Sequence, residues 1–238
     1  MTAQFAVVSK RPPAASRFAV VPTNRRPCVL KALGAIAPQV DKVIVIETLG
    51  SIAPDPVHSN AIRAHAPGVS IFVDDKPGMS VSRWWNKGLG LAQHFARRAG
   101  LEKWEVAVLN DDVIVPEGWF DAVSHGLRHL QAVAACSGGL LPKPILHTKP
   151  GPVNLMTRMQ GFAYMLAGEW ELRADETMPW WCSDDDLDWT ARALGGMVMI
   201  PGFHVDHLYP NGQMTPELHV QAGQDMETFV AKWKERPW

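Results

Sequence analysis

The sequence predicts an α/β domain in which a mostly parallel central sheet is flanked by helices. Apolar runs alternate with amphipathic segments through the first half of the chain. These runs are nearly continuous in hydrophobic residues, which is typical of parallel strands that are covered on both faces. Of the 238 residues, 47% are hydrophobic, enough for a sizeable core. We therefore expect one domain over residues 1–238.

Strands and helices are expected to alternate up to about residue 109. Pro22 and a polar turn close the first apolar run, and Pro27 stands at the start of the helical spacing that follows. Ser80 or Ser82 can cap the long amphipathic helix, and Gly100 can end it. The predicted elements are, in order, a strand at 18–21, a helix at 28–36, a strand at 42–48, a helix at 59–66, a strand at 69–75, a helix at 80–100 and a strand at 105–109.

The second half departs from this alternation. Residues 139–158 are rich in Pro, Gly and Lys and are too long for an ordinary connection, which favours a mobile functional loop. The other predicted elements are strands at 132–138 and 160–169, a helix at 180–196 that opens with acids, a strand and turn at 197–207, and a helix from 216 to Pro237.

Charge and cysteine content bear on partners and compartment. The formal net charge is −1, so the overall balance demands neither nucleic acid nor an anionic membrane. A basic cluster near the start is a hint of an anionic ligand: Lys10, Arg11, Arg17, Arg25 and Arg26. The three cysteines are widely spaced and form no C-x-x-C pair. With no run of membrane-span length and no signal-peptide layout, we expect a cytoplasmic protein without a membrane span.

Polar and acidic residues follow four of the predicted strands, at the edge where open parallel sheets bind ligands. They are Pro22, Thr23 and Asn24; Glu47; Asp74 and Asp75; and Asn110, Asp111 and Asp112. Adjacent like charges repel unless water or a cation separates them. Asp111 and Asp112 therefore either end at a solvated surface or meet a metal ion, and we favour the metal ion.

A second acidic cluster, Asp184 to Asp186, opens the helix predicted at 180–196. Acids in a first helical turn are stabilised by the helix dipole, so a solvated helix start is one interpretation. The bulky Trp180 and Trp181 just before them favour the wall of a pocket instead. Asp188 and Arg192, four residues apart, can pair, which would leave Asp185 and Asp186 free. His204 and His207 fit a metal site and a polar turn equally well.

The order of these features resembles that of the family 2 glycosyltransferases, inverting enzymes with the GT-A fold, over essentially the whole chain. The matching segments are V-V-P-T-N-R, N-K-G-L-G-L-A, L-N-D-D-V-I-V-P-E-G-W, G-F-A-Y-M-L-A-G-E, D-D-L-D-W-T-A-R-A-L-G-G and P-G-F-H-V-D-H. The resemblance implies a GT-A-like, Rossmann-related domain with a nucleotide-binding half (1–115), an acceptor-binding half (116–215) and a helical tail (216–238). Two departures are Asn110 in place of an acid and Glu47 in place of the usual Asp.

The resemblance also implies roles for single residues. Asp112 and His207, with His204 in reserve, would bind Mn²⁺ or Mg²⁺ against the diphosphate of a nucleotide-sugar donor, a UDP-sugar being favoured. Asp185, with Asp186 next in line, would be the catalytic base, and Trp180 and Trp181 would stack on the acceptor. The donor itself would contact Pro22, Thr23, Asn24, Glu47, Asp75, Asn86, Asn110 and Asp111.

The predicted activity is metal-dependent, inverting transfer of a sugar to an acceptor hydroxyl. The acceptor stays open among glycan, protein, small molecule and modified nucleic acid. Near-neutral charge disfavours a duplex, although the basic cluster near the start and the loop residues Lys143, Lys149 and Arg158 keep nucleic acid open. One alternative is a nucleotidyltransferase that makes sugar nucleotides, disfavoured because P-T-N-R-R-P lacks glycines. The other is a non-catalytic carbohydrate-binding module on the same fold. The donor sugar and the oligomeric state stay open.

Overall fold

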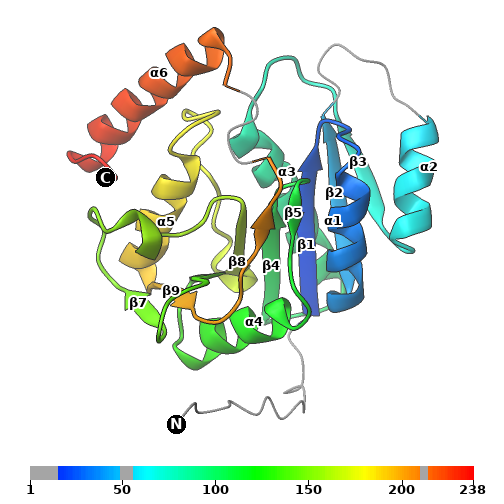
Figure 1. Ribbon diagram of the computed structural model, residues 1–238, viewed down its shortest axis with the longest axis horizontal. Helices are drawn as coiled ribbons and strands as arrows, with labels where there is room; N and C mark the ends of the chain where they lie inside the picture. Colours follow the sequence, from blue (N-terminus) through cyan, green and yellow to red (C-terminus); the bar gives the residue numbers. More distant parts are fainter. Residues whose placement is uncertain (1–15, 49–55, 210–213) are drawn as a thin grey trace.

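The computed structural model describes residues 16–48, 56–209 and 214–238, and an eight-stranded sheet runs through it (Figure 1). The strands are β1 (Ser16–Thr23), β2 (Lys42–Thr48), β3 (Ser70–Asp74), β4 (Trp104–Leu109), β5 (Val113–Ile114), β6 (Ala134–Ser137), β7 (Ile145–His147), β8 (Ala163–Ala167), β9 (Met197–Ile200) and β10 (Asp206–His207). The helices are α1 (Val29–Ile36), α2 (Pro56–His65), α3 (Val81–Arg98), α4 (Trp119–His129), α5 (Ser183–Leu194) and α6 (Pro216–Trp233). Short 3₁₀ turns are η1 (Ala37–Gln39), η2 (Leu155–Thr157) and η3 (Gly168–Trp170).

The sheet order is β3-β2-β1-β4-β8-β6-β9-β7. The strands from β3 to β4 pair in parallel, as do β6 and β9, whereas β8 and β7 run antiparallel to their neighbours. A separate two-stranded ribbon joins β5 to β10. The predicted fold class, a mostly parallel sheet flanked by helices, is confirmed.

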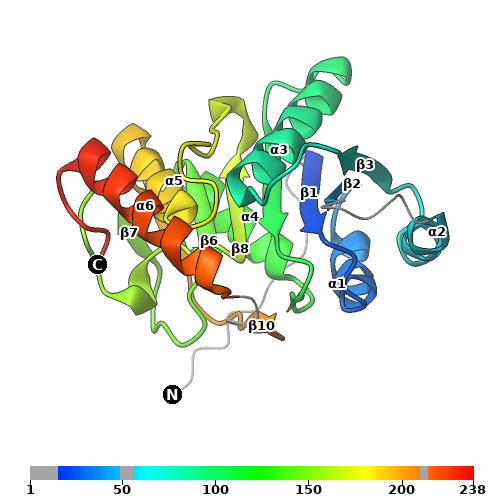
Figure 2. The ribbon, with the colours of Figure 1, turned by 90° about the horizontal axis from the view of Figure 1, so that it is seen from above.

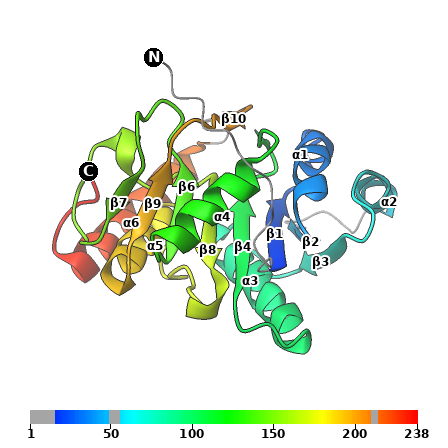
Figure 3. The same cartoon turned by 90° about the horizontal axis from the view of Figure 1, so that it is seen from below.

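Two helical layers cover the sheet (Figures 2 and 3). Successive side chains of a strand point to opposite faces, and in β1 Ala19 and Val21 pack in a core with α1, α2 and α4. Phe18 and Val20 pack on the other face, in a core with α3 and α5. A Cβ on Gly88 of α3 would lie 2.1 Å from a methyl carbon of Val20, so this glycine lets α3 lie close on β1.

Most predicted elements form within a few residues of the expected bounds. The strand predicted at 42–48 is β2, and Ser80 caps α3 by accepting a hydrogen bond from the Arg83 N–H at 3.3 Å. Helix α4 was not predicted, although its apolar residues recur at helical spacing. The segment 139–158 is also more ordered than expected, because β7 adds a three-residue edge strand and η2 a short turn.

The basic residues near the start do not form one surface. Arg17 is buried and pairs with Glu105 at 3.3 Å at the opposite end of β1 from Arg26, and it also contacts Asp121. Lys10 and Arg11 lie outside the described residues. The three cysteines are buried and form no disulfide. None of the helices in the described ranges combines the length and the apolarity needed to cross a bilayer.

Candidate active site

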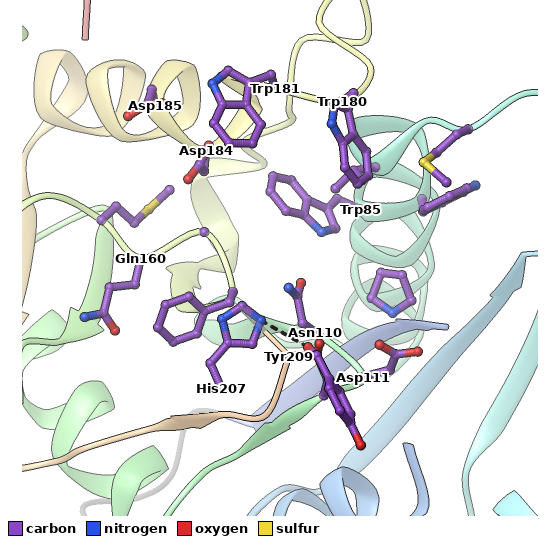
Figure 4. Close-up of a pocket in the computed structure, with 18 of the residues that line it drawn as sticks. Trp85, Asn110, Asp111, Gln160, Trp180, Trp181, Asp184, Asp185, His207 and Tyr209 are labelled. Carbon is purple, nitrogen blue, oxygen red and sulfur yellow. Dashed lines mark ion pairs between the residues drawn. The ribbon is translucent and has the colours of Figure 1, made fainter. Parts of the chain in front are cut away.

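A cavity of about 470 Å³ lies beyond the carboxyl ends of β1 and β4, where α/β sheets bind ligands. Figure 4 shows Asn110, Asp111 and His207 at one end of it and Asp184 and Asp185 at the other. Its lining includes Pro22, Asn24 and Arg26 after β1; Trp84 and Trp85 on α3; Asn110 to Asp112 after β4; Arg158 to Phe162; Trp180, Trp181, Asp184 and Asp185; His207 and Tyr209; and Trp238. Segments far apart in the sequence thus meet around one space.

The Asp112 carboxylate lies between a guanidinium group and an imidazole. Arg26 Nη1 donates a hydrogen bond to Asp112 Oδ2 at 2.6 Å, and His207 Nε2 lies 3.2 Å from Oδ1. Antiparallel pairing of β10 with β5 brings His207 to this place, and the imidazole stacks on Phe162. Burial acts to raise the pKa of Asp112, but the hydrogen bonds and charges of His207 and Arg26 outweigh it and lower this pKa. Asp112 is therefore held in its ionised form.

Asp111 has a different environment from its neighbour. Thr23 Oγ1 donates a hydrogen bond to Asp111 Oδ2 at 2.7 Å, whereas Arg26 Nη1 is 3.8 Å from Oδ1. Burial raises the pKa of Asp111, and the Thr23 hydrogen bond only partly offsets it. The pKa values of the two adjacent acids are thus shifted in opposite directions, which reduces the repulsion that their sequence implies.

Asp112 and His207 suit a divalent cation. Asp112 Oδ1 is buried, and the side-chain group beside it is the imidazole nitrogen of His207, 3.2 Å away. A carboxylate oxygen next to an imidazole nitrogen is a donor pair found in Mn²⁺ sites, and Mg²⁺ is commonly held by one or two carboxylates together with phosphate oxygens and water. Within the described ranges, no group of three or more His, Cys, Asp or Glu side chains is placed to bind a metal. The remaining ligands would have to come from substrate and water.

The acids at the start of α5 are divided between two environments. Asp184 and Asp185 line the cavity, and Arg158 Nη1 donates to Asp185 Oδ1 at 2.6 Å. The Arg158 guanidinium also lies over the Trp238 ring, 4.7 Å from its centroid. Burial, with a contribution from the charge of Asp184, raises the pKa of Asp185 to about 8, while Arg158 opposes the shift. Asp185 is therefore a stronger proton acceptor than an ordinary carboxylate once it is ionised.

Asp186, the reserve candidate for the base, does not line the cavity. Its carboxylate accepts hydrogen bonds from Lys232 Nζ at 3.0 Å and from Trp233 Nε1 at 2.7 Å. Asp188 pairs with Arg192 as predicted, with Arg192 Nε 2.9 Å from Asp188 Oδ1. The expectation that this pair leaves Asp185 and Asp186 free is wrong, because Arg158 and α6 supply partners for both.

Helix α6 positions the tryptophan pair. Asp225 is fully buried, and its Oδ2 accepts hydrogen bonds from the backbone N–H groups of Trp180 at 2.8 Å and Trp181 at 2.6 Å. Trp189 of α5 packs edge-on against Phe229 of α6. Nothing in the spacing of the sequence links Asp225 to the tryptophans, so this support was not predicted.

Several residues predicted to contact the donor lie outside the cavity lining. Thr23 is buried behind Asp111, and Glu47 accepts a hydrogen bond from Ser59 at 3.1 Å. Asn86 donates to the Ala174 carbonyl and to Glu176, so it ties α3 to the loop before α5. Asp75 is exposed while its neighbour Asp74 pairs with Arg83. His204, the reserve candidate for the metal ligand, also lies outside the lining and is exposed beside Asp206. The predicted residues that do line it are Pro22, Asn24, Asn110, Asp111, Asp112, Trp180, Trp181, Asp185 and His207.

Other cavity residues were given no site role from the sequence, notably Arg26, Trp85, Asp184 and Trp238. Arg26 was noted only as part of the basic cluster, and Asp184 only as part of the acidic triplet. Gly161 is a sequence feature linked to Asp184 in the structure, because a Cβ at this position would lie 2.3 Å from Asp184 Oδ2. A residue larger than glycine would displace the Asp184 carboxylate.

The comparisons with known proteins identify relatives by fold only. No protein-family model and no curated protein matches the chain. Solved structures do: S. aureus TarS residues 1–349 has a TM-score of 0.54 at 10% identity, over 92% of this chain and 73% of that one. A longer S. aureus TarS structure gives 0.57 at 10% identity, over 94% of this chain but only 40% of that one. TarS 1–349 in complex with UDP-GlcNAc gives 0.54 at 11% identity, over 94% and 68% of the two chains, and TarS 1–349 has also been solved with UDP.

Proposed function

We propose that this chain is a glycosyltransferase that moves a sugar from a nucleoside diphosphate sugar to an acceptor hydroxyl, with inversion at the anomeric carbon. One observation carries the proposal: a single cavity joins the Asp112–His207–Arg26 group to a second buried acid, Asp185. The first group could bind a diphosphate, and Asp185 could accept the proton of an acceptor hydroxyl. The TarS complexes with UDP-GlcNAc and UDP support a UDP-sugar as donor.

At the diphosphate end, the chain would bind and neutralise the leaving group. Asp112 and His207 would hold Mn²⁺ or Mg²⁺, which supplies positive charge against the leaving diphosphate. Arg26 lines the same end and can turn its guanidinium from Asp112 to a phosphate oxygen. Pro22, Asn24, Asn110 and Asp111 would surround the nucleoside and the sugar, so residues 1–115 supply most of the donor site.

At the acceptor end, Asp185 would act as the general base. Its carboxylate takes the proton of the acceptor hydroxyl as that oxygen bonds to the anomeric carbon, while the bond from this carbon to the diphosphate oxygen breaks. Attack from the side opposite the diphosphate inverts the configuration. Trp180 and Trp181, which residues 216–238 hold through Asp225, would stack on the acceptor.

A thermal-shift panel tests the proposal. UDP, GDP, CDP, ADP, the corresponding sugar nucleotides, the nucleoside triphosphates and sugar 1-phosphates are titrated with and without Mn²⁺. We expect a nucleoside diphosphate, UDP first, to raise the melting temperature, and Mn²⁺ to increase that shift, because ligands that bind only the folded state stabilise it. If no nucleotide shifted the melting temperature, the proposal would be contradicted. A shift with only a nucleoside triphosphate and a sugar phosphate would favour the nucleotidyltransferase.

The pH dependence of transfer should report the raised pKa of Asp185. The base must be ionised, so activity is expected to rise with pH and level off above about 8, rather than above the ordinary carboxylate range. Arg158→Gln removes the cation that opposes the shift, so the rising limb should move to still higher pH. A profile that is flat from pH 5 to 9 in both proteins would contradict the assignment.

A further inference from the structure

Two tryptophan side chains that line the cavity have indole N–H groups with no acceptor among the described residues. The Nε1 atoms of Trp85 and Trp180 are buried and donate no hydrogen bond within the described part of the chain. Trp85 is 4% exposed, and in Figure 4 it lies between the Asp184 end and the Asp111 end of the cavity. Buried donors are nearly always paired, so an exception on the wall of a cavity indicates a group that arrives with a ligand.

The neighbouring residue shows that this pattern is not general on α3. Trp84 also lines the cavity, but its Nε1 donates to Asp74 Oδ2 at 3.0 Å. Trp85 is held in place by packing alone, since its ring meets Tyr164 edge-on at 5.4 Å between centroids. The Trp84 N–H therefore has an acceptor in the protein, whereas the Trp85 N–H has none in the described ranges.

The surroundings of Trp85 define the chemistry of the missing acceptor. The charged groups that could bind phosphate, Arg26 with Asp112 and His207, lie at the far end of the cavity from Asp185. The lining residues that pack in the same core as Trp85 are apolar, namely Val81 and Met159. An indole N–H in such a wall suits a neutral oxygen, such as a hydroxyl or an amide carbonyl, on a ring with an apolar face.

We infer that the Trp85 N–H, with that of Trp180 as a second donor, binds oxygen atoms of the sugar that is transferred. This inference rests on the proposed function and deepens it, because it assigns the sugar part of the donor to a subsite separate from the diphosphate. Trp85 then selects among nucleotide sugars, while the affinity for the nucleoside diphosphate alone does not depend on its N–H.

The test compares Trp85→Phe with Trp84→Phe, a matched change one residue away. Phenylalanine keeps an aromatic ring and removes the N–H in both. Calorimetry measures the affinities for UDP and for UDP-glucose, UDP-galactose and UDP-GlcNAc. We expect Trp85→Phe to lower the affinity for the best-bound UDP-sugar by about tenfold, because the variant loses one hydrogen bond to the ligand. The affinity for UDP should stay within about twofold of the wild-type value. Trp84→Phe should leave the ratio of the two affinities unchanged.

Thermal unfolding supplies an independent readout. Removing the unpaired Trp85 N–H loses no hydrogen bond, so the melting temperature of Trp85→Phe should fall only through the lost packing of the larger ring. Trp84→Phe should in addition lose the hydrogen bond to Asp74. Equal losses of UDP and UDP-sugar affinity in Trp85→Phe, or no loss, would overturn the subsite alone. If the wild-type protein bound UDP but bound none of the UDP-sugars more tightly than UDP, the subsite would also be overturned. A wild-type protein that binds no nucleotide would overturn the proposed function together with the subsite.

Discussion

Asp185→Asn is expected to lower turnover by about 10²–10⁴-fold, the usual contribution of a general base. Asparagine keeps the shape of the side chain and can still contact Arg158, but it cannot accept the acceptor proton. Donor affinity should stay within about twofold, since the diphosphate end is untouched. Release of nucleoside diphosphate under saturating donor and acceptor measures the first quantity, and calorimetry with the donor measures the second.

Asp186→Asn is the matched control for this variant. Asp186 is an acid of the same helical turn, but it is bound to Lys232 and Trp233 rather than to the cavity. Its replacement should lower the melting temperature with far less effect on turnover per folded molecule. If Asp185→Asn turned over at the wild-type rate while Asp186→Asn did not, the base would have to be moved to Asp186 or to another group.

Asp112→Asn is expected to lower kcat/KM by at least about 100-fold and to remove the response to Mn²⁺. A metal ion on a leaving diphosphate contributes several kcal/mol, and each 1.36 kcal/mol is about a factor of ten. The variant also frees Arg26 from its ion pair at 2.6 Å, so some nucleotide affinity independent of metal should remain. Titration of UDP with and without Mn²⁺ separates the two contributions.

Asp75→Asn serves as the control for Asp112→Asn. Asp75 is likewise an acid at the end of a parallel strand, but it is exposed and outside the cavity lining. We expect it to behave as the wild type in both titrations. Full activity of Asp112→Asn with an unchanged Mn²⁺ response would show that the metal assignment is mistaken.

The strands and most helices could be predicted because their signals are local. Apolar runs, caps such as Ser80 and closing glycines such as Gly100 act within a few residues, and the structure reproduces them. The acids after β4 were also predictable, since the topology of parallel strands carries their carboxyl ends to one edge. Helix α4 carries a comparable local pattern in its apolar residues and was nonetheless not assigned.

The partners of the site residues could not be predicted, because they depend on contacts between distant segments. The Asp112–Arg26 ion pair, the Asp185–Arg158 ion pair and the Asp225 hydrogen bonds each join separate elements. Asn86 fits a recognisable helix motif, but its side-chain amide hydrogen-bonds to Ala174 and Glu176. The rotation of a helix about its axis decides which of several consecutive acids faces a cavity. The folded structure was therefore needed to show that Asp185 lines the cavity and Asp186 does not.

Anomalous diffraction from a crystal soaked with Mn²⁺ and UDP tests the central claim most directly. We expect a manganese peak bonded to Asp112 and His207 and to oxygen atoms of the diphosphate, with the Arg26 guanidinium moved from Asp112 toward a phosphate. Nucleotide bound in the cavity with no manganese peak, and with Arg26 still paired to Asp112, would contradict the account.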